Sequence, residues 1–152
     1  MSVPAWRISG AVFVVLLLCS ARSDAACTIS TTSVAFGTYD VFSAAPLDST
    51  GTVTFRCGPP DRNIVITLSR GSSATFSPRT LRMGAEVLNY NLYNNAARTN
   101  IWGDGTGGTA VYSNANPPNN TNIPLTVYAR IPAGQDVSGG SYNDTVVVTI
   151  NF

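Results

Sequence analysis

The chain has 152 residues and nearly balanced charge, with nine Lys plus Arg, eight Asp plus Glu and no histidine. A net charge of +1 without a basic run argues against nucleic acid as a partner. The missing histidine removes the usual imidazole base and the Ser-His and Cys-His nucleophile pairs. Lysine is also absent, which removes Schiff-base chemistry. We therefore predict that the protein is not an enzyme and uses no cofactor.

The first 25 residues have the layout of a secretory signal peptide. A positively charged start is followed by an unbroken apolar run at 11–19, and small residues, Ser23 and Ala25, precede the expected cut. The apolar run is too short for a membrane-spanning helix, which needs about 20 residues. The sequence therefore predicts a signal peptide at 1–25 and one exported domain at 26–152, with no integral membrane segment after cleavage.

Strand patterns dominate the rest of the chain. Alternating apolar and polar residues predict strands at 28–36, 51–57, 63–69, 80–83, 87–93, 123–131 and 141–152. A hairpin turn is expected around Gly84, between the fourth and fifth of these segments. After the signal, no segment shows the apolar period of a helix. Short strands joined by Gly, Pro and Asn turns predict an all-β sandwich.

The segment 94–122 is different, because it is rich in Asn and Gly and predicts long loops with one hairpin. Two interpretations of the aromatic residues in this segment and directly before it stay open. Tyr93, Trp102 and Tyr112 could form a surface-binding loop, or the large Trp102 could be a core residue. The glycine-rich stretch at 103–108 offers a single carboxylate, too few for a calcium loop, so we predict a turn and no metal site.

Two cysteines remain after the expected cleavage, Cys27 and Cys57. An even pair in an exported chain predicts one disulfide, which also excludes a zinc site formed by their thiolates. A bridge over a loop of this length stabilises a domain by about 3–4 kcal/mol in the chain-entropy model.

Five segments resemble the spore coat protein U domain family. They are Cys-Thr-Ile-Ser at 27–30, Val-Ala-Phe-Gly-Thr-Tyr-Asp at 34–40, Gly-Thr-Val-Thr-Phe-Arg-Cys at 51–57, Tyr-Ala-Arg-Ile-Pro-Ala-Gly-Gln at 128–135 and Gly-Ser-Tyr-Asn-Asp-Thr at 140–145. The resemblance runs from the first residue after the expected cut to the chain end. It implies an incomplete immunoglobulin-like β-sandwich that lacks its last strand, as in archaic chaperone–usher pilus subunits and related secreted coat proteins.

The resemblance also implies partners and a binding groove. The implied partners are a periplasmic chaperone, an usher and neighbouring subunits, and the groove between the two sheets would accept a donor strand from the chaperone or a neighbour. The final segment fits this role, because its apolar residues alternate along one face that would be an aggregation hazard if left open. These predicted groove residues are Tyr142, Val146, Val148, Ile150 and Phe152.

The leading hypothesis is a structural or adhesive subunit of a surface fibre or spore coat, exported through the periplasm to the cell surface. The alternative is a stand-alone secreted β-sandwich module that binds carbohydrate or a surface. Because the expected cut leaves only Ala26 before Cys27, we also expect the subunit to accept a donor strand but not to give one.

Overall fold

The computed structural model describes residues 27–152. The expected signal peptide and the expectation that no donor segment precedes Cys27 both concern residues 1–26, which lie outside the described part. Within the described part, no helix has the length and apolar content needed to span a membrane.

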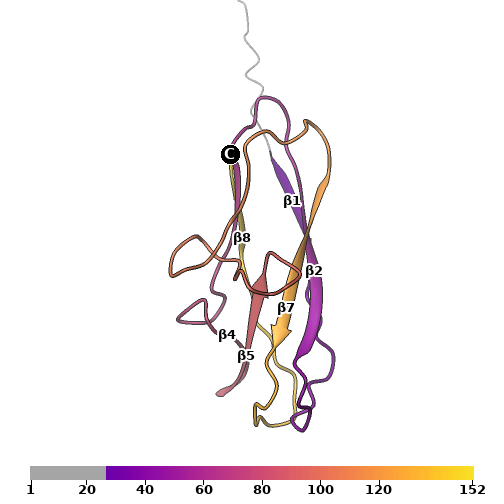
Figure 1. The fold of residues 1–152 in the computed structure, drawn as a ribbon, viewed down its shortest axis with the longest axis vertical. Coiled ribbons are helices and arrows are strands. Elements are labelled where there is room, and N and C mark those ends of the chain that lie inside the picture. The colour runs from indigo at the N-terminus through magenta and orange to yellow at the C-terminus, as the bar shows by residue number, and fades with distance from the viewer. Residues whose placement is uncertain (1–26) are drawn as a thin grey trace, which may run out of the picture.

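Two antiparallel sheets run roughly along the long axis of the domain (Figure 1). The first contains, in spatial order, β1 (Thr28–Thr32), β2 (Leu47–Arg56), β7 (Ile123–Ile131), β5 (Glu86–Tyr93) and β4 (Arg79–Met83). The second contains β6 (Tyr112–Asn114), β3 (Ile64–Leu68) and β8 (Val148–Asn151). The order makes β1 an edge strand of one sheet and β8 an edge strand of the other.

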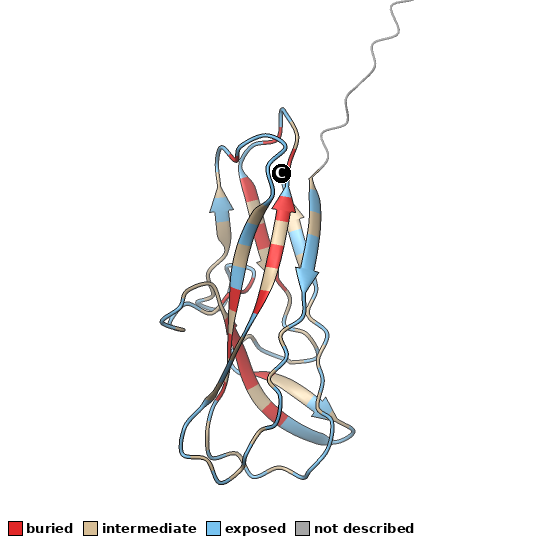
Figure 2. Ribbon diagram, turned by 90° about the vertical axis from the view of Figure 1, so that its right-hand side faces the viewer, coloured by how far each residue is buried: buried red, intermediate tan, exposed pale blue. Residues whose placement is uncertain are grey.

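The core lies between the sheets, because alternate residues of each central strand point toward the facing sheet. Figure 2 shows this as buried residues that alternate with residues of intermediate exposure along single strands. Side chains from β2, β3 and β7 supply much of it: Val53, Phe55, Ile64, Ile66, Leu68, Val127, Ala129 and Ile131. The predicted all-β sandwich is therefore confirmed.

Most predicted strands form close to their expected bounds, and β7 matches its prediction at both ends. The hairpin turn at Gly84 also forms, with a backbone φ of 60°. Strand β2 begins at Leu47 rather than at Gly51, because its polar first half pairs with β7 from the Leu47–Ile131 pair onward. The final strand is shorter than predicted, since only Val148–Asn151 forms a continuous ladder with β3.

One charged side chain, that of Arg79 in β4, forms hydrogen bonds with several segments of the core. Arg79 is fully buried and donates hydrogen bonds to the backbone oxygens of Ser69 (2.9 Å) and Trp102 (2.7 Å) and to Asn91 Oδ1 (2.9 Å). Burial lowers the pKa of Arg79, yet a guanidinium stays protonated in proteins. Each of these acceptors belongs to a different segment, so Arg79 joins the end of β3, β5 and the loop that carries Trp102.

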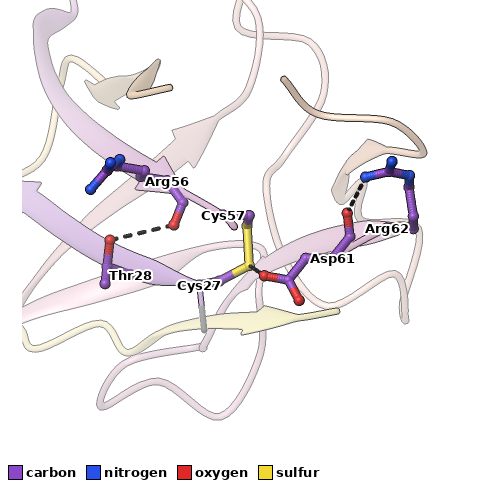
Figure 3. Close-up of a disulfide and its surroundings, with 6 residues drawn as sticks. All are labelled: Cys27, Thr28, Arg56, Cys57, Asp61 and Arg62. Atoms are coloured by element: carbon purple, nitrogen blue, oxygen red, sulfur yellow. Dashed lines mark hydrogen bonds between the residues drawn. A yellow bond between two sulfur atoms is a disulfide. The ribbon is translucent and has the colours of Figure 1, made fainter. Parts of the chain in front are cut away.

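The predicted disulfide is present and joins Cys27, before β1, to Cys57, after β2 (Figure 3). The buried carboxylate of Asp61 lies beside it, with Oδ2 3.4 Å from Cys27 Sγ. A disulfide sulfur carries no proton, so this is a contact and not a hydrogen bond. Cys27, Cys57 and Asp61 cluster closely enough to suggest a metal site. However, sulfurs bonded to each other are not the thiolates that zinc requires.

Candidate functional site

The segment 142–152 uses one of its two backbone edges. In β8 that edge pairs with β3, from Leu68–Val148 to Val65–Asn151. Upstream, Val147 exchanges hydrogen bonds with Ser69: its carbonyl accepts from the Ser69 N–H and its own N–H donates to Ser69 Oγ, both at 2.9 Å. Asn143 then exchanges two backbone hydrogen bonds with Arg82 of β4, at 2.8 and 3.1 Å. At Asn143, at Val147 and at the odd-numbered residues of β8, the backbone N–H and C=O groups therefore point toward β4 or β3.

The even-numbered residues present the other backbone edge. Successive residues of an extended strand direct their N–H and C=O groups to opposite sides. Within residues 27–152, the backbone groups of Asp144 and Val146 form no hydrogen bonds. Among the strands of the described residues, none pairs with β8 on the side away from β3. The segment thus offers an unpaired edge, to which another strand could add.

Residues 33–42, which follow β1, lie across from this edge. They form no strand and are held by isolated contacts: Ser49 Oγ donates to the Ala35 carbonyl at 2.6 Å, and Tyr39 OH donates to the Pro132 carbonyl at 3.0 Å. Val34, Phe36 and Tyr39 pack against the core from this side. A sparsely bonded segment here leaves the space beside the free edge open.

Two cavities of about 320 and 1020 Å³ lie along this space, and together we call them the edge groove. The smaller is lined mainly by apolar side chains, among them Val53, Leu68, Leu92, Val127, Val146 and Val148. The larger is lined by residues of both flanking segments and the core, among them Phe42, Leu88, Ile131, Val137 and Tyr142. Four residues line both cavities: Val34, Phe36, Leu81 and Asp144.

Only some of the five predicted groove residues line the edge groove. Val146 and Val148 line the smaller cavity, and Tyr142 lines the larger one. Ile150 packs against the core further along β8, and Phe152 is 55% exposed at the chain end. The structure thus brings three of the five residues to the edge groove.

Sequence reasoning missed Asp144, which lies on the same inward face as Tyr142 and Val146. Its Oδ2 accepts a hydrogen bond from Tyr90 OH at 2.7 Å. Its Oδ1 accepts hydrogen bonds from the backbone N–H groups of Ser72 and Thr145, both at 2.8 Å. The period of two that links the apolar residues also includes position 144, and this signal could have identified it.

Tyr90 is 4% exposed, and burial, followed by the adjacent Asp144, raises its pKa. Its hydroxyl therefore keeps its proton and remains a donor to Asp144. On the opposite side, a Cβ at Gly71 would overlap the Asp144 carboxylate, and Gly71 has a φ of 65° that favours glycine. The structure thus encloses Asp144 between β5 and the turn at 70–73.

The suggested surface-binding loop of Tyr93, Trp102 and Tyr112 does not form. Trp102 is 1% exposed, and its indole N–H donates to the Ile66 carbonyl at 3.0 Å. It is therefore a core residue, and its assignment to a binding surface was wrong, because this large ring finds both apolar contacts and an acceptor inside. Tyr93 lies on the five-stranded sheet, whereas Tyr112 lies on the three-stranded sheet and packs against Phe55.

The glycine-rich stretch at 103–108 contains a turn stabilised by its own residues. Asp104 Oδ1 accepts from the Thr106 N–H at 2.9 Å and from the Thr106 hydroxyl at 2.6 Å. These bonds lower the pKa of Asp104, with the hydroxyl as the larger cause. The carboxylate is thus engaged within its own turn.

Comparison with known proteins places the chain in a family. The spore coat protein U domain model matches residues 13–149. Protein U of Myxococcus xanthus is 37% identical over 130 residues, which cover 77% of this chain and 70% of that protein. The chain belongs to the spore coat protein U domain family.

Solved structures of the same fold come from pilus systems. One is the CsuC–CsuE chaperone–tip adhesion subunit pre-assembly complex from the archaic chaperone–usher Csu pili of Acinetobacter baumannii, with a TM-score of 0.60 and 24% identity. The match covers 84% of this chain and 40% of that longer chain. A chaperone–usher pilus structure matches over 99% of this chain and 98% of its own, with a TM-score of 0.53 and 13% identity. These matches confirm the predicted incomplete immunoglobulin-like sandwich.

Proposed function

We propose that this chain is a structural or adhesive subunit of a surface fibre or coat, and that its edge groove accepts a strand from another polypeptide. The observation that carries the proposal is the free backbone edge at Asp144 and Val146, which runs beside a largely apolar groove. Family membership and the fold shared with pilus subunits support the same role.

The free backbone edge and the apolar groove beside it are both unfavourable when no partner covers them. A strand added at this edge would hydrogen-bond to the unpaired N–H and C=O groups, and its alternate side chains would enter the groove. Main-chain bonds would supply affinity, and the fit of side chains in the cavities would supply register. An open apolar edge without such a strand promotes edge-to-edge aggregation.

The partners follow from this role. A periplasmic chaperone would supply the strand first, and a neighbouring subunit would replace it during assembly with an usher. The protein would then pass through the periplasm to the cell surface, a pilus or a spore coat. The alternative role as a stand-alone binding module loses its main aromatic anchor, because Trp102 is buried.

Photo-crosslinking at adjacent positions tests the proposal. A photoreactive amino acid at position 146 would face the groove, whereas the same residue at position 147 would replace a side chain that is 59% exposed on the opposite face. We expect position 146 to cross-link to a second polypeptide in the exporting cells and position 147 not to. Equal adducts at both positions, or none at 146 in assembled material, would contradict the proposal.

Hydrogen exchange gives an independent measurement on the same segment. The amides of Asp144 and Val146 are free in the described structure, whereas the Val147 amide already donates to Ser69 Oγ. Binding of a strand should protect the two even-numbered amides and change the protection of Val147 little. Uniform protection of all three amides would indicate general tightening instead of strand addition.

A further inference from the structure

Resting on the proposed function, we propose that the strand which fills the edge groove carries a hydrogen-bond donor, such as Ser, Thr or Asn, at one inward position. That position is the one facing Asp144, and the inward positions on either side of it are apolar. Asp144 and Tyr90 together would then select the partner strand and set its register.

Asp144 can still accept a further hydrogen bond. A carboxylate oxygen can accept about two hydrogen bonds. Oδ1 already accepts two, from the N–H groups of Ser72 and Thr145, whereas Oδ2 accepts only one, from Tyr90 OH. Tyr90 has donated its single hydroxyl proton, so its oxygen also offers only acceptor capacity. Both residues line the smaller cavity, where they form a spot that accepts but does not donate.

The side chain that covers this spot must replace the hydrogen bond that water makes to Asp144. An aliphatic side chain placed over Asp144 would remove water from the carboxylate without replacing its hydrogen bond. A carboxylate placed there would add repulsion between like charges. A neutral donor avoids both costs. We expect it to bind about tenfold more tightly than valine at this position, the factor that corresponds to one net hydrogen bond.

The spacing of the inward residues determines where the donor would lie along the added strand. Inward residues of the segment follow a period of two, so Val146 comes next after Asp144 and lines the smaller cavity, while Tyr142 precedes it and lines the larger one. An added strand has the same period. Its donor residue would therefore be the single polar residue in an otherwise apolar series of inward residues. It would lie between the apolar side chains that enter the two cavities.

A purely structural role for Asp144 makes a different prediction. Asp144 holds the turn at Ser72 against β5 through its two oxygens. If this were its whole role, substitutions at 144 would change stability but not the residue preferred at any position of the partner. The test must therefore measure preference as well as stability.

The experiment uses the full chain, exported and refolded in the presence of synthetic strand-length peptides that alternate Thr and Val. In each peptide one inward Val is replaced by Ser, Asn or Asp, and binding is measured by fluorescence polarisation. We expect one position at which Ser and Asn bind about tenfold better than Val and Asp binds worst. At every other inward position Val should bind best.

The same peptides are then tested against Asp144→Asn and Asp144→Leu. Asp144→Asn keeps an oxygen for the Ser72 and Thr145 N–H groups and so preserves the turn. It should remove the penalty against Asp at the selected position, and Asp144→Leu should make Val preferred there. Preference for Val at every position of the wild type, or preferences unchanged in both variants, would overturn the inference. Failure of every peptide to bind the wild type would overturn the proposed function itself.

Discussion

Replacing Tyr90 with phenylalanine should weaken the domain by the value of one charge-assisted hydrogen bond. The substitution removes the hydroxyl that donates to Asp144 Oδ2 at 2.7 Å and keeps the ring, which packs edge-to-face on Phe36 with centroids 6.1 Å apart. A hydrogen bond to a charged group contributes about 1.5–3 kcal/mol. Because Asp144 also lines the groove, water can replace the lost donor, so we expect about 1.5 kcal/mol, or roughly 5 °C in Tm.

The same substitution should change how stability depends on alkaline pH. Burial raises the pKa of Tyr90 in the folded state above the unfolded value, which is about 10. The stabilisation is therefore fully present below about pH 10 and is lost as the pH rises toward the folded pKa. Over that range the unfolded tyrosine releases a proton that the folded one keeps, so wild-type stability falls by about 1.4 kcal/mol per pH unit from this residue alone.

Urea denaturation of the wild type and Tyr90→Phe at about pH 8 and about pH 11 measures both effects. All other tyrosines are common to the two proteins, so the difference in free energy of unfolding isolates Tyr90. It should be about 1.5 kcal/mol at the lower pH and close to zero at the higher one. At about pH 8, Tyr128→Phe serves as a control, because it keeps the ring beside Arg98 and removes a hydroxyl that makes no hydrogen bond among the described residues. A gap between wild type and Tyr90→Phe that persists unchanged at about pH 11 would refute the reasoning.

Three further substitutions test other parts of the structure. Arg79→Leu should cost about 3 kcal/mol or more in chemical denaturation, because two buried acceptors and one half-buried acceptor lose their charged donor; a cost below about 1 kcal/mol would contradict this. Gly71→Ala should lower Tm more than Gly84→Ala. Both glycines have positive φ, but only at Gly71 would the added Cβ overlap the Asp144 carboxylate; equal losses would count against that contact. Replacing Cys27 and Cys57 together by serine should cost about 3–4 kcal/mol by denaturation, and an unchanged midpoint would show that the bridge over their 30-residue separation contributes little.

The alternation of apolar and polar residues along the chain predicted β7 and the inward direction of two side chains near the C-terminal end. The period of two in 123–131 gave β7 at its observed bounds, and the same pattern identified Val146 and Val148 as inward-facing. The first half of β2 was not predicted, because Leu47 and the polar residues after it become a strand only through pairing with β7. No local pattern reports such a pairing, since the two strands are distant in sequence.

The edge groove was predictable on one side only. Its apolar residues on the C-terminal segment follow from alternation, whereas Val34, Phe36 and Leu81 reach the cavities from segments that only the tertiary fold brings together. Asp144 was overlooked for another reason. A search for apolar alternation passes over a charged residue, even when that residue occupies the same face.

The position of Asp144 links the groove to the core of the domain. Through Oδ1 it holds the turn at Ser72, and through Oδ2 it binds Tyr90, whose ring packs on Phe36 in the facing segment. The turn at Ser72, β5 and the facing segment are therefore connected through one carboxylate. A strand that adds a hydrogen bond at Asp144 would act on all three at once. Correct occupancy should consequently stabilise the turn and the facing segment, beyond what backbone pairing along the free edge provides.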